Sequence, residues 1–333
     1  MNDLAQLGIL LADGASSDAK QAIDRRIEQA LTEDTLSDHS GCAKKNDIHA
    51  ETQWYAVAMW IRNGVILALA LGTAIAQPPP KSVRLYVFDG GAIQGFNPSA
   101  FHFTKEELAT TDMVVASYLI VHPKGTLVWD SGAIPDGAIK GDGTPAKQSF
   151  FSASKTMKSQ LAAIGYKPSD ITYFGLSHYH GDHTANANDF ATATWVVQAP
   201  EREAMFSEKT PPQQLGSYKS LKDAKTKLLH GEDFDVFGDG TVVVKAAYGH
   251  TPGHQVLYVK LAKTGPILLA GDLFHYQEER GTDKTPTFEF SREQSLASRE
   301  AMEAFCKKTG TQLWIEHDLA NFNKQKKAPD YLE

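Results

Sequence analysis

Short apolar runs separated by turn residues dominate the chain from Ser82 onward. The runs have the length and the β-branched and aromatic content of strands, not of helices. The expected strands are residues 84–88, 114–121, 126–129, 171–176, 195–198, 225–229, 241–246, 255–260, 266–270 and 313–315. Between the second and the third, His122-Pro123-Lys124-Gly125 predicts a hairpin-type turn.

Helical patterns lie between and after these strands. Residues 150–165 repeat apolar positions on one helical face, at Met157, Leu161 and Ile164. Short helical character is also expected over 200–206, and a capping box at 291–294 opens a helix that ends at Gly310. The turn chemistry of 207–218 predicts a surface loop. Strands and helices fall into two similar halves, so we expect an α/β fold: a sandwich of two central mixed sheets flanked by helices.

The first 76 residues show a different pattern. An apolar run from Gly64 to Ala76 follows Arg62 and precedes Gln77-Pro78-Pro79-Pro80. Such a run is typical of a secretory signal peptide and is short for a membrane span. We therefore expect 1–58 to be a doubtful N-terminal extension, 59–76 a signal peptide that starts at Met59, and 77–333 the mature domain. The alternative is an uncleaved membrane anchor or amphipathic helix on a genuine extension.

Composition and charge restrict the partners. With 42% hydrophobic and 22% charged residues the chain has the composition of a soluble globular protein. A net charge of -7 without a basic cluster argues against nucleic acid. Export predicts a periplasmic or extracellular location, without a stable membrane anchor after signal cleavage. Cys306 is the one cysteine of 77–333, so no internal disulfide is expected there and the residue is assigned to a buried helix face. The sequence is compatible with a homodimer.

The densest chemistry lies in Ser177-His178-Tyr179-His180-Gly181-Asp182-His183, directly after the apolar run 171–176. Alternate residues at a strand end project to the same side, so His178 and His180 can converge on one ion. Gly181 allows a tight turn, after which Asp182 and His183 can face a second ion. Only 12 of 333 residues are histidine, so three within six positions indicate a metal site.

Two complete metal sites need more ligands than this segment supplies. Three candidates follow apolar, strand-like runs further along the chain. They are His250 in Gly-His-Thr-Pro-Gly-His, Asp272 in Ala-Gly-Asp-Leu-Phe, and His317 in Ile-Glu-His-Asp.

The series HxHxDH, His, Asp and His at strand ends resembles the ligand motifs of the metallo-beta-lactamase superfamily. The spacing of these motifs and the residues around them are most similar to those of the N-acyl-homoserine lactonases. The likeness runs from about Ser82 to Tyr331. It implies two divalent ions, with Zn²⁺ expected, and a small-molecule ester or lactone substrate. Residue by residue, it implies that one ion is held by His178, His180 and His250, the other by Asp182, His183 and His317, and that Asp272 bridges the two.

The resemblance also implies a reaction. A hydroxide shared by the two ions attacks a lactone or carboxylic ester carbonyl, and Asp182 can pass a proton to the leaving oxygen. Lactonases carry a tyrosine three residues beyond the bridging aspartate, where this chain has His275, followed by Tyr276. Either side chain is a candidate for orienting substrate. The lactonases also tend to have an aromatic residue where Gly181 stands, so acyl-chain contacts are expected to differ, and related enzymes border the cleft with a loop such as 207–218.

Other members of the superfamily fit less well. A zinc beta-lactamase would typically have cysteine or a non-ligand at Asp272, and a hydroxyacylglutathione hydrolase would add a C-terminal domain where only 16 residues follow His317. The leading hypothesis is thus a dinuclear lactonase. Acyl-homoserine lactones are its candidate substrates, which would make it a quorum-quenching enzyme. The alternatives are a phosphotriesterase or arylesterase on the same site, or a mononuclear iron persulfide dioxygenase.

The remaining polar residues are assigned supporting positions. Asp130, in Asp-Ser-Gly, and His254 are expected to support the ligands without binding metal. Glu316, Asp318 and Asn321 flank His317 and can orient it. Solvent exposure is expected for three further histidines, His102, His122 and His230.

Overall fold

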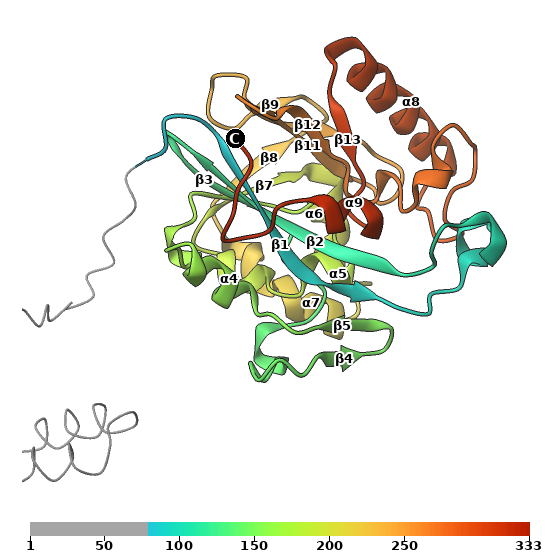
Figure 1. Cartoon of the computed structure of the whole chain (residues 1–333), viewed down its shortest axis with the longest axis horizontal. Coiled ribbons are helices and arrows are strands. Elements are labelled where there is room, and N and C mark those ends of the chain that lie inside the picture. Colours follow the sequence, from blue (N-terminus) through green and yellow to red (C-terminus); the bar gives the residue numbers. More distant parts are fainter. Residues whose placement is uncertain (1–78) are drawn as a thin grey trace, which may run out of the picture. The chain divides into compact units, whose positions relative to one another are not determined.

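The computed structural model describes residues 79–333, which form two β-sheets packed face to face with helices outside them (Figure 1). The larger sheet has eight strands and the smaller has five. Those of the larger sheet are β1 (Arg84–Ile93), β2 (Met113–His122), β3 (Gly125–Trp129), β4 (Ala146–Gln148), β5 (Phe151–Ala153), β6 (Tyr173–Gly175), β7 (Thr194–Gln198) and β8 (Thr226–Leu229). The smaller sheet has β9 (Phe234–Asp235), β10 (Val242–Ala246), β11 (Gln255–Leu261), β12 (Gly265–Leu269) and β13 (Gln312–Trp314).

Both sheets are mixed. The larger runs in the order β4-β5-β1-β2-β3-β6-β7-β8, antiparallel through β3 and parallel from β3 to β8. The smaller runs β13-β12-β11-β10-β9, and only its β12–β13 pair is parallel. Parallel neighbours need crossover connections, which the helices between these strands provide.

The helices of residues 79–333 lie mostly on the outer faces of the two sheets, but the last one packs its buried Phe322 into the core between them. Their bounds are α4 (Met157–Ala163), α5 (Gly181–Thr184), α6 (Ala199–Met205), α7 (Pro212–Tyr218), α8 (Arg292–Thr309) and α9 (Leu319–Lys324). On β2, Leu119 and Val121 pack toward α4, α6 and α7, whereas Ile120 faces the smaller sheet. On β11, Val256 packs toward α8 and Leu257 toward the larger sheet. Burial on both faces, worth roughly 1.5–3 kcal/mol for each large apolar side chain, explains the near-continuous apolar runs, and the predicted sandwich is confirmed.

Three predictions about local structure were wrong. The helix expected over 150–165 begins at Met157, and Phe151–Ala153 forms β5 instead. The loop expected over 207–218 contains α7 from Pro212 onward. His122 is buried, not solvated: its ring stacks on Phe237 at 4.2 Å and its Nε2 lies 2.9 Å from Asp239 Oδ2.

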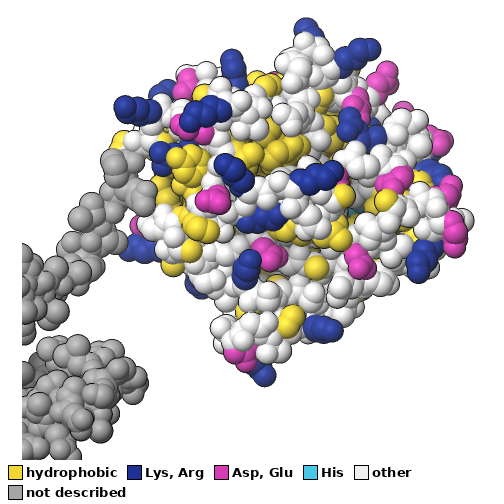
Figure 2. All heavy atoms as spheres, in the orientation of Figure 1, with side chains coloured by type: hydrophobic (Ala, Val, Ile, Leu, Met, Phe, Trp, Pro, Cys, Tyr) yellow, Lys and Arg dark blue, Asp and Glu magenta, His cyan; other side chains and the backbone are white. Residues whose placement is uncertain are grey.

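Surface charge, membrane-spanning helices and the N-terminal segments were also the subject of predictions. Positive and negative side chains are interspersed over the face drawn in Figure 2, without a patch of one sign. Among the helices of residues 79–333, none has the length and apolar character needed to cross a bilayer. The predicted signal peptide at 59–76 and the doubtful extension at 1–58 lie outside the described residues.

Candidate metal centre

The segment His178 to His183 leaves the end of β6 and turns into the short helix α5. At the strand end the backbone passes against the Trp129 indole, and a Cβ on Gly175 would lie 2.6 Å from that ring. His178 and His180 precede α5, whereas Asp182 and His183 lie in its first turn and are buried. This change of direction separates the first pair of side chains from the second.

Three further side chains reach the same place from the smaller sheet. His250 comes from the β10–β11 connection, Asp272 follows β12, and His317 follows β13. The structure brings all seven predicted ligands together in two groups whose donor atoms lie within 4.8 Å of one another. The groups are His178, His180, His250 and Asp272, and Asp182, His183 and His317.

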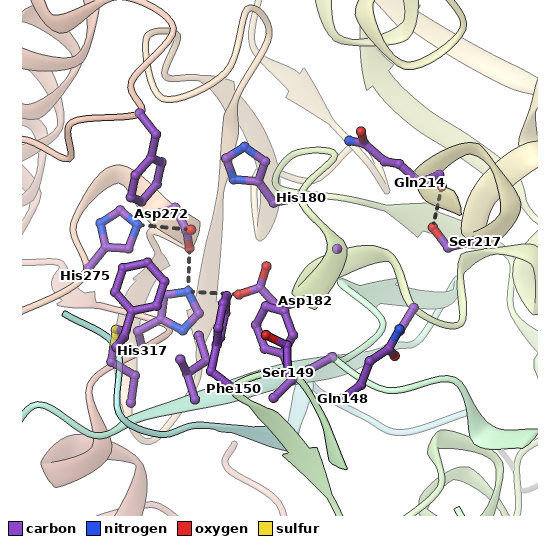
Figure 3. A pocket seen from close by; sticks show the side chains of 18 of the residues that line it. Gln148, Ser149, Phe150, His180, Asp182, Gln214, Ser217, Asp272, His275 and His317 are labelled. Atoms are coloured by element: carbon purple, nitrogen blue, oxygen red, sulfur yellow. Dashed lines mark hydrogen bonds and ion pairs between the residues drawn. The ribbon is translucent and has the colours of Figure 1, made fainter. Parts of the chain in front are cut away.

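Asp272 lies between the two groups (Figure 3). Its Oδ2 is 3.5 Å from His178 Nε2 and 3.4 Å from His250 Nε2. Its Oδ1 is 3.2 Å from His183 Nε2 and 3.0 Å from His317 Nε2. Donor atoms around a tetrahedral zinc ion with bonds of about 2.0–2.1 Å lie roughly 3.3 Å apart. The separations therefore suit one ion on each side of the carboxylate.

Several buried polar atoms of the centre have no hydrogen-bond partner among the described residues. They include His178 Nε2, His183 Nε2 and Asp272 Oδ1. Burial lowers the pKa values of His178 and His180 well below the ordinary value, so both rings are neutral and their lone pairs are free to bind a cation. Imidazole nitrogen together with carboxylate oxygen suits divalent ions of the zinc type. The residues thus fit two metal ions.

In His317 and His183, the ring nitrogen that faces away from the proposed ion contacts another residue of the protein. His317 Nδ1 donates to the Val114 carbonyl at 2.7 Å. His183 Nδ1 lies 3.3 Å from Asp130 Oδ2 and 3.2 Å from Glu316 Oε1. Partners of this kind fix the tautomer and direct the other nitrogen toward the metal. Asp130 thus supports a ligand, as the sequence suggested. Glu316, which was expected to orient His317, contacts His183 instead, and Asp318 caps α9 by accepting a hydrogen bond from Asn321 N.

His254 supports the bridging carboxylate. Its Nδ1 donates to the Ala247 carbonyl at 3.0 Å, and its Nε2 accepts from the backbone N–H of Asp272 at 3.1 Å. Burial lowers the pKa of His254 to about 3, which keeps Nε2 an acceptor. Gly271 allows this approach, because its φ is +50° and a Cβ there would lie 2.7 Å from Ser177 Cβ. His254 is therefore a support and not a ligand, as predicted.

Comparison with known proteins shows the family. The model of the metallo-beta-lactamase superfamily matches residues 110–305. The chain belongs to the metallo-beta-lactamase superfamily. Its class of enzyme, a metal-dependent hydrolase, agrees with the sequence prediction and is confirmed.

Individual relatives agree with this assignment. The N-acyl homoserine lactonase AttM of Azorhizobium caulinodans is 28% identical over 264 residues, which cover 75% of this chain and 99% of AttM. A solved N-acyl homoserine lactone hydrolase with the product N-hexanoyl-L-homoserine at its metal centre has a TM-score of 0.61 at 24% identity, over 75% of this chain and 98% of that one. AidC, a dizinc quorum-quenching lactonase, has a TM-score of 0.53 at 18% identity, over 75% and 93%. The two structures support the fold.

A pocket of about 610 Å³ opens above the centre of this superfamily member. Figure 3 shows Asp272, His275 and His317 on one side and Gln214 and Ser217 on the other. The walls are largely apolar and aromatic, with Phe96, Phe101, Phe150 and Phe288 among them. The Phe288 ring lies 5.9 Å from the His250 ring and 5.7 Å from the Phe101 ring.

Of the two candidates after the bridging aspartate, the structure brings one to the pocket. His275 lines it, with Nε2 3.2 Å from Asp272 Oδ2. Tyr276 packs instead against Phe101, and its hydroxyl donates to the Thr111 carbonyl at 3.4 Å. Asp182 also lines the pocket.

Sequence reasoning did not find several residues of the site. Phe288 and Glu289 lie in the connection before α8, where Glu289 Oε1 is 3.5 Å from His250 Nδ1. Glu201 is buried behind the centre. A phenylalanine or a glutamate outside a motif carries no local signal, but a Phe-Glu-Phe sequence before a capping box could have raised the question.

Proposed function

We propose that this protein is a dinuclear metal lactonase that opens the ester ring of N-acyl-homoserine lactones. The observation that carries the proposal is the position of Asp272, whose two oxygens face different histidine groups below the pocket. The relatives named N-acyl homoserine lactonases match over nearly their whole length and support this substrate class. Hydrolysis of such signalling molecules would make the protein a quorum-quenching enzyme.

Zinc is the ion we propose for both groups, because five histidines and two carboxylates form a donor set of nitrogen and oxygen. Two such ions supply Lewis-acid polarisation of the ester carbonyl and an activated water. The task of the chain is to hold the seven side chains in place and to exclude competing ligands. The buried ring nitrogens and the supports behind them serve both purposes.

Two pocket residues are proposed to act on the substrate. His275 can donate a hydrogen bond from Nε2 to the carbonyl oxygen as negative charge develops there. Asp182 has a carboxylate oxygen 3.6 Å from His317 Nε2 and lines the pocket, so it can accept a proton from the attacking water and pass it to the leaving oxygen. Tyr276 is given no catalytic role, because its hydroxyl points to Thr111.

The pocket lining favours a neutral substrate with an apolar arm. No lysine or arginine lines it within residues 79–333, and its two carboxylates belong to the metal groups. The aromatic wall can contact an acyl chain. The opposite wall can hydrogen-bond an amide or ring oxygen through Gln148, Gln213, Gln214 and Ser217.

The test is a hydrolysis screen of the purified protein over acyl-homoserine lactones, aryl esters and phosphotriesters, together with elemental analysis. We expect about two zinc ions per chain and the highest kcat/KM on the lactones. His180→Ala and Asp272→Ala should each lower kcat/KM by at least about a hundredfold, with far-UV circular dichroism unchanged. His230→Ala, which changes an exposed histidine outside the centre, is the matched control and should behave as wild type.

Other outcomes distinguish the alternatives. Faster turnover of phosphotriesters or aryl esters than of any lactone would reassign the substrate while keeping the centre. One iron per chain with oxygen uptake on a persulfide would instead make the protein a dioxygenase and reject the hydrolytic proposal.

A further inference from the structure

A buried carboxylate that no step of the proposed reaction uses lies behind the metal centre. Glu201, in the first turn of α6, is only 2% exposed. The carboxylate has no lysine, arginine or histidine within ion-pair distance among the described residues, so it is compensated by neutral donors alone. Burial raises the pKa of Glu201 to about 7, and the hydrogen bonds that it accepts oppose this rise, so the ionised form depends on these donors.

The donors come from two loops. Glu201 Oε1 accepts from the backbone N–H of Tyr179 at 2.8 Å. Oε2 accepts from the backbone N–H of Gly253 at 2.8 Å. The Thr251 hydroxyl lies 2.9 Å from Oε1 and 2.8 Å from Oε2, so it joins both. One carboxylate therefore receives hydrogen bonds from three residues of two loops, each of them distant from Glu201 in sequence.

These three residues are neighbours of the first metal group. Tyr179 lies between His178 and His180, and Thr251 directly follows His250. The first two histidines belong to the larger sheet and the third to the smaller one. Glu201 thus connects the two loops from which all three histidines of that group project. No member of the second group is a direct sequence neighbour of these donors. Asp182 and His183 follow Tyr179 in the same segment, and His317 is distant in sequence from all three donors.

Local packing supports a close fit. A Cβ on Gly253 would lie 2.5 Å from the backbone nitrogen of Glu201, so the loop backbone lies directly on α6. At the base of the same loops, Gln255 donates from its backbone N–H to the Ser177 carbonyl at 2.9 Å. Gln255 joins the strands, whereas Glu201 joins the loop ends that carry the histidines.

We propose that Glu201 is a positioning residue that sets the separation between His178/His180 and His250 and thereby the metal affinity of the first group. The inference rests on the proposed dinuclear centre. It predicts that weakening the hydrogen bonds of Glu201 loosens one of two ions and leaves the other in place.

The decisive variant is Glu201→Gln, which keeps the shape of the side chain. Its amide nitrogen must face either the N–H of Tyr179 or that of Gly253, so one of these contacts becomes donor against donor. Glu203→Gln, on the exposed side of the same helix, is the matched control. Zinc affinity of both sites is measured by competition with a chromophoric chelator, and the Tm of metal-free protein is recorded alongside.

For Glu201→Gln we expect one of the two zinc ions to bind about 10–100-fold more weakly, with the other unchanged and with a kcat/KM that added zinc restores. Glu203→Gln should match wild type throughout. If Glu201→Gln binds both zinc ions with the affinities of wild type, the positioning role of Glu201 is rejected and the metal centre is not. Equal weakening of both ions together with a lower Tm of the metal-free protein would also overturn this role, because it indicates general destabilisation. A wild-type protein that binds no zinc would instead reject the metal centre, and this inference with it.

Discussion

At the scale of single residues, the centre keeps polar atoms buried without hydrogen-bond partners among residues 79–333. His178 Nε2 and Asp272 Oδ1 are examples, and an unpaired buried polar group costs about 1–3 kcal/mol. Natural cores satisfy nearly all such groups, so a cluster of exceptions indicates a ligand. The atoms on the far side of the same rings are satisfied, as by Val114 behind His317. The contrast between the two sides shows which direction the site faces.

A pair of substitutions separates the two residues after the bridging aspartate. His275→Phe should lower kcat/KM by about 10²–10³-fold, the usual effect of losing one donor to a developing oxyanion. Tyr276→Phe should change it less than about twofold, because the lost hydroxyl contacts Thr111 and not the pocket. Steady-state kinetics on a lactone substrate measure both. The reverse order of effects would assign the carbonyl contact to Tyr276.

How far each residue could be predicted depends on where its partners lie. His178, His180, Asp182 and His183 are close in sequence, so their spacing alone indicates a site. Glu201 contacts residues 22, 50 and 52 positions away, and nothing in its own surroundings distinguishes it from the exposed Glu203. His122 was misjudged for the same reason, since Phe237 and Asp239 bury it from a distant turn.

At the scale of elements, ten of the thirteen strands in residues 79–333 were predictable, whereas the short strands β4, β5 and β9 and the helix α7 were not. Burial on both faces gives the central strands apolar runs that can be recognised without the fold. The strand β5 is only three residues long and is defined by its pairing with β1, which no local pattern reveals. The helix α7 contains Pro212 and Gly216, which were taken as turn signals, although Pro212 stands at its first position, where proline is tolerated.

The start of α4 depends on a side chain outside the helix. Asp136 Oδ1 accepts from Met157 N at 2.7 Å and Oδ2 from Lys158 N at 3.0 Å, while Thr156 caps Ser159 N. These are N–H groups of the first turn, which have no partner within the helix. The carboxylate explains why the helix begins at Met157 and not earlier in the apolar pattern.

Replacement of this distant cap should affect stability and not catalysis. We expect Asp136→Ala to lower the free energy of unfolding by about 1 kcal/mol, because two first-turn N–H groups lose a charged acceptor. Urea denaturation followed by circular dichroism measures the change. Lactone kinetics should stay within about twofold of wild type, and an unchanged urea midpoint would show that the helix start does not depend on Asp136.

At the scale of the whole molecule, the metal centre joins the two sheets. Ligands come from the ends of β6, β12 and β13 and from the β10–β11 connection, so both sheets contribute to each group. Ions bound there would hold the folded state together and would have no comparable site in the unfolded chain. Metal binding and global stability should therefore be linked.

Removal of metal by a chelator should lower the Tm. Zinc at about a hundred times its Kd stabilises the folded state by about 2.7 kcal/mol, which corresponds to roughly 5–10 °C for a domain of this size. Differential scanning fluorimetry with zinc and with EDTA measures the shift. Asp272→Ala, which removes the carboxylate shared by both groups, is the control and should show little of it. Equal shifts in the two proteins would mean that the ions act elsewhere.

The start of the mature chain belongs to the same scale. All seven proposed ligands lie between His178 and His317, and the family match begins at residue 110. We propose export through a signal peptide at 59–76, with a mature chain in the periplasm or outside the cell. N-terminal sequencing of protein from the native host should find a start near Gln77, because small residues before that position suit signal cleavage. Peptides from 1–58 in that material would reject the start at Met59, and membrane-bound protein that retains 59–76 would identify an uncleaved anchor.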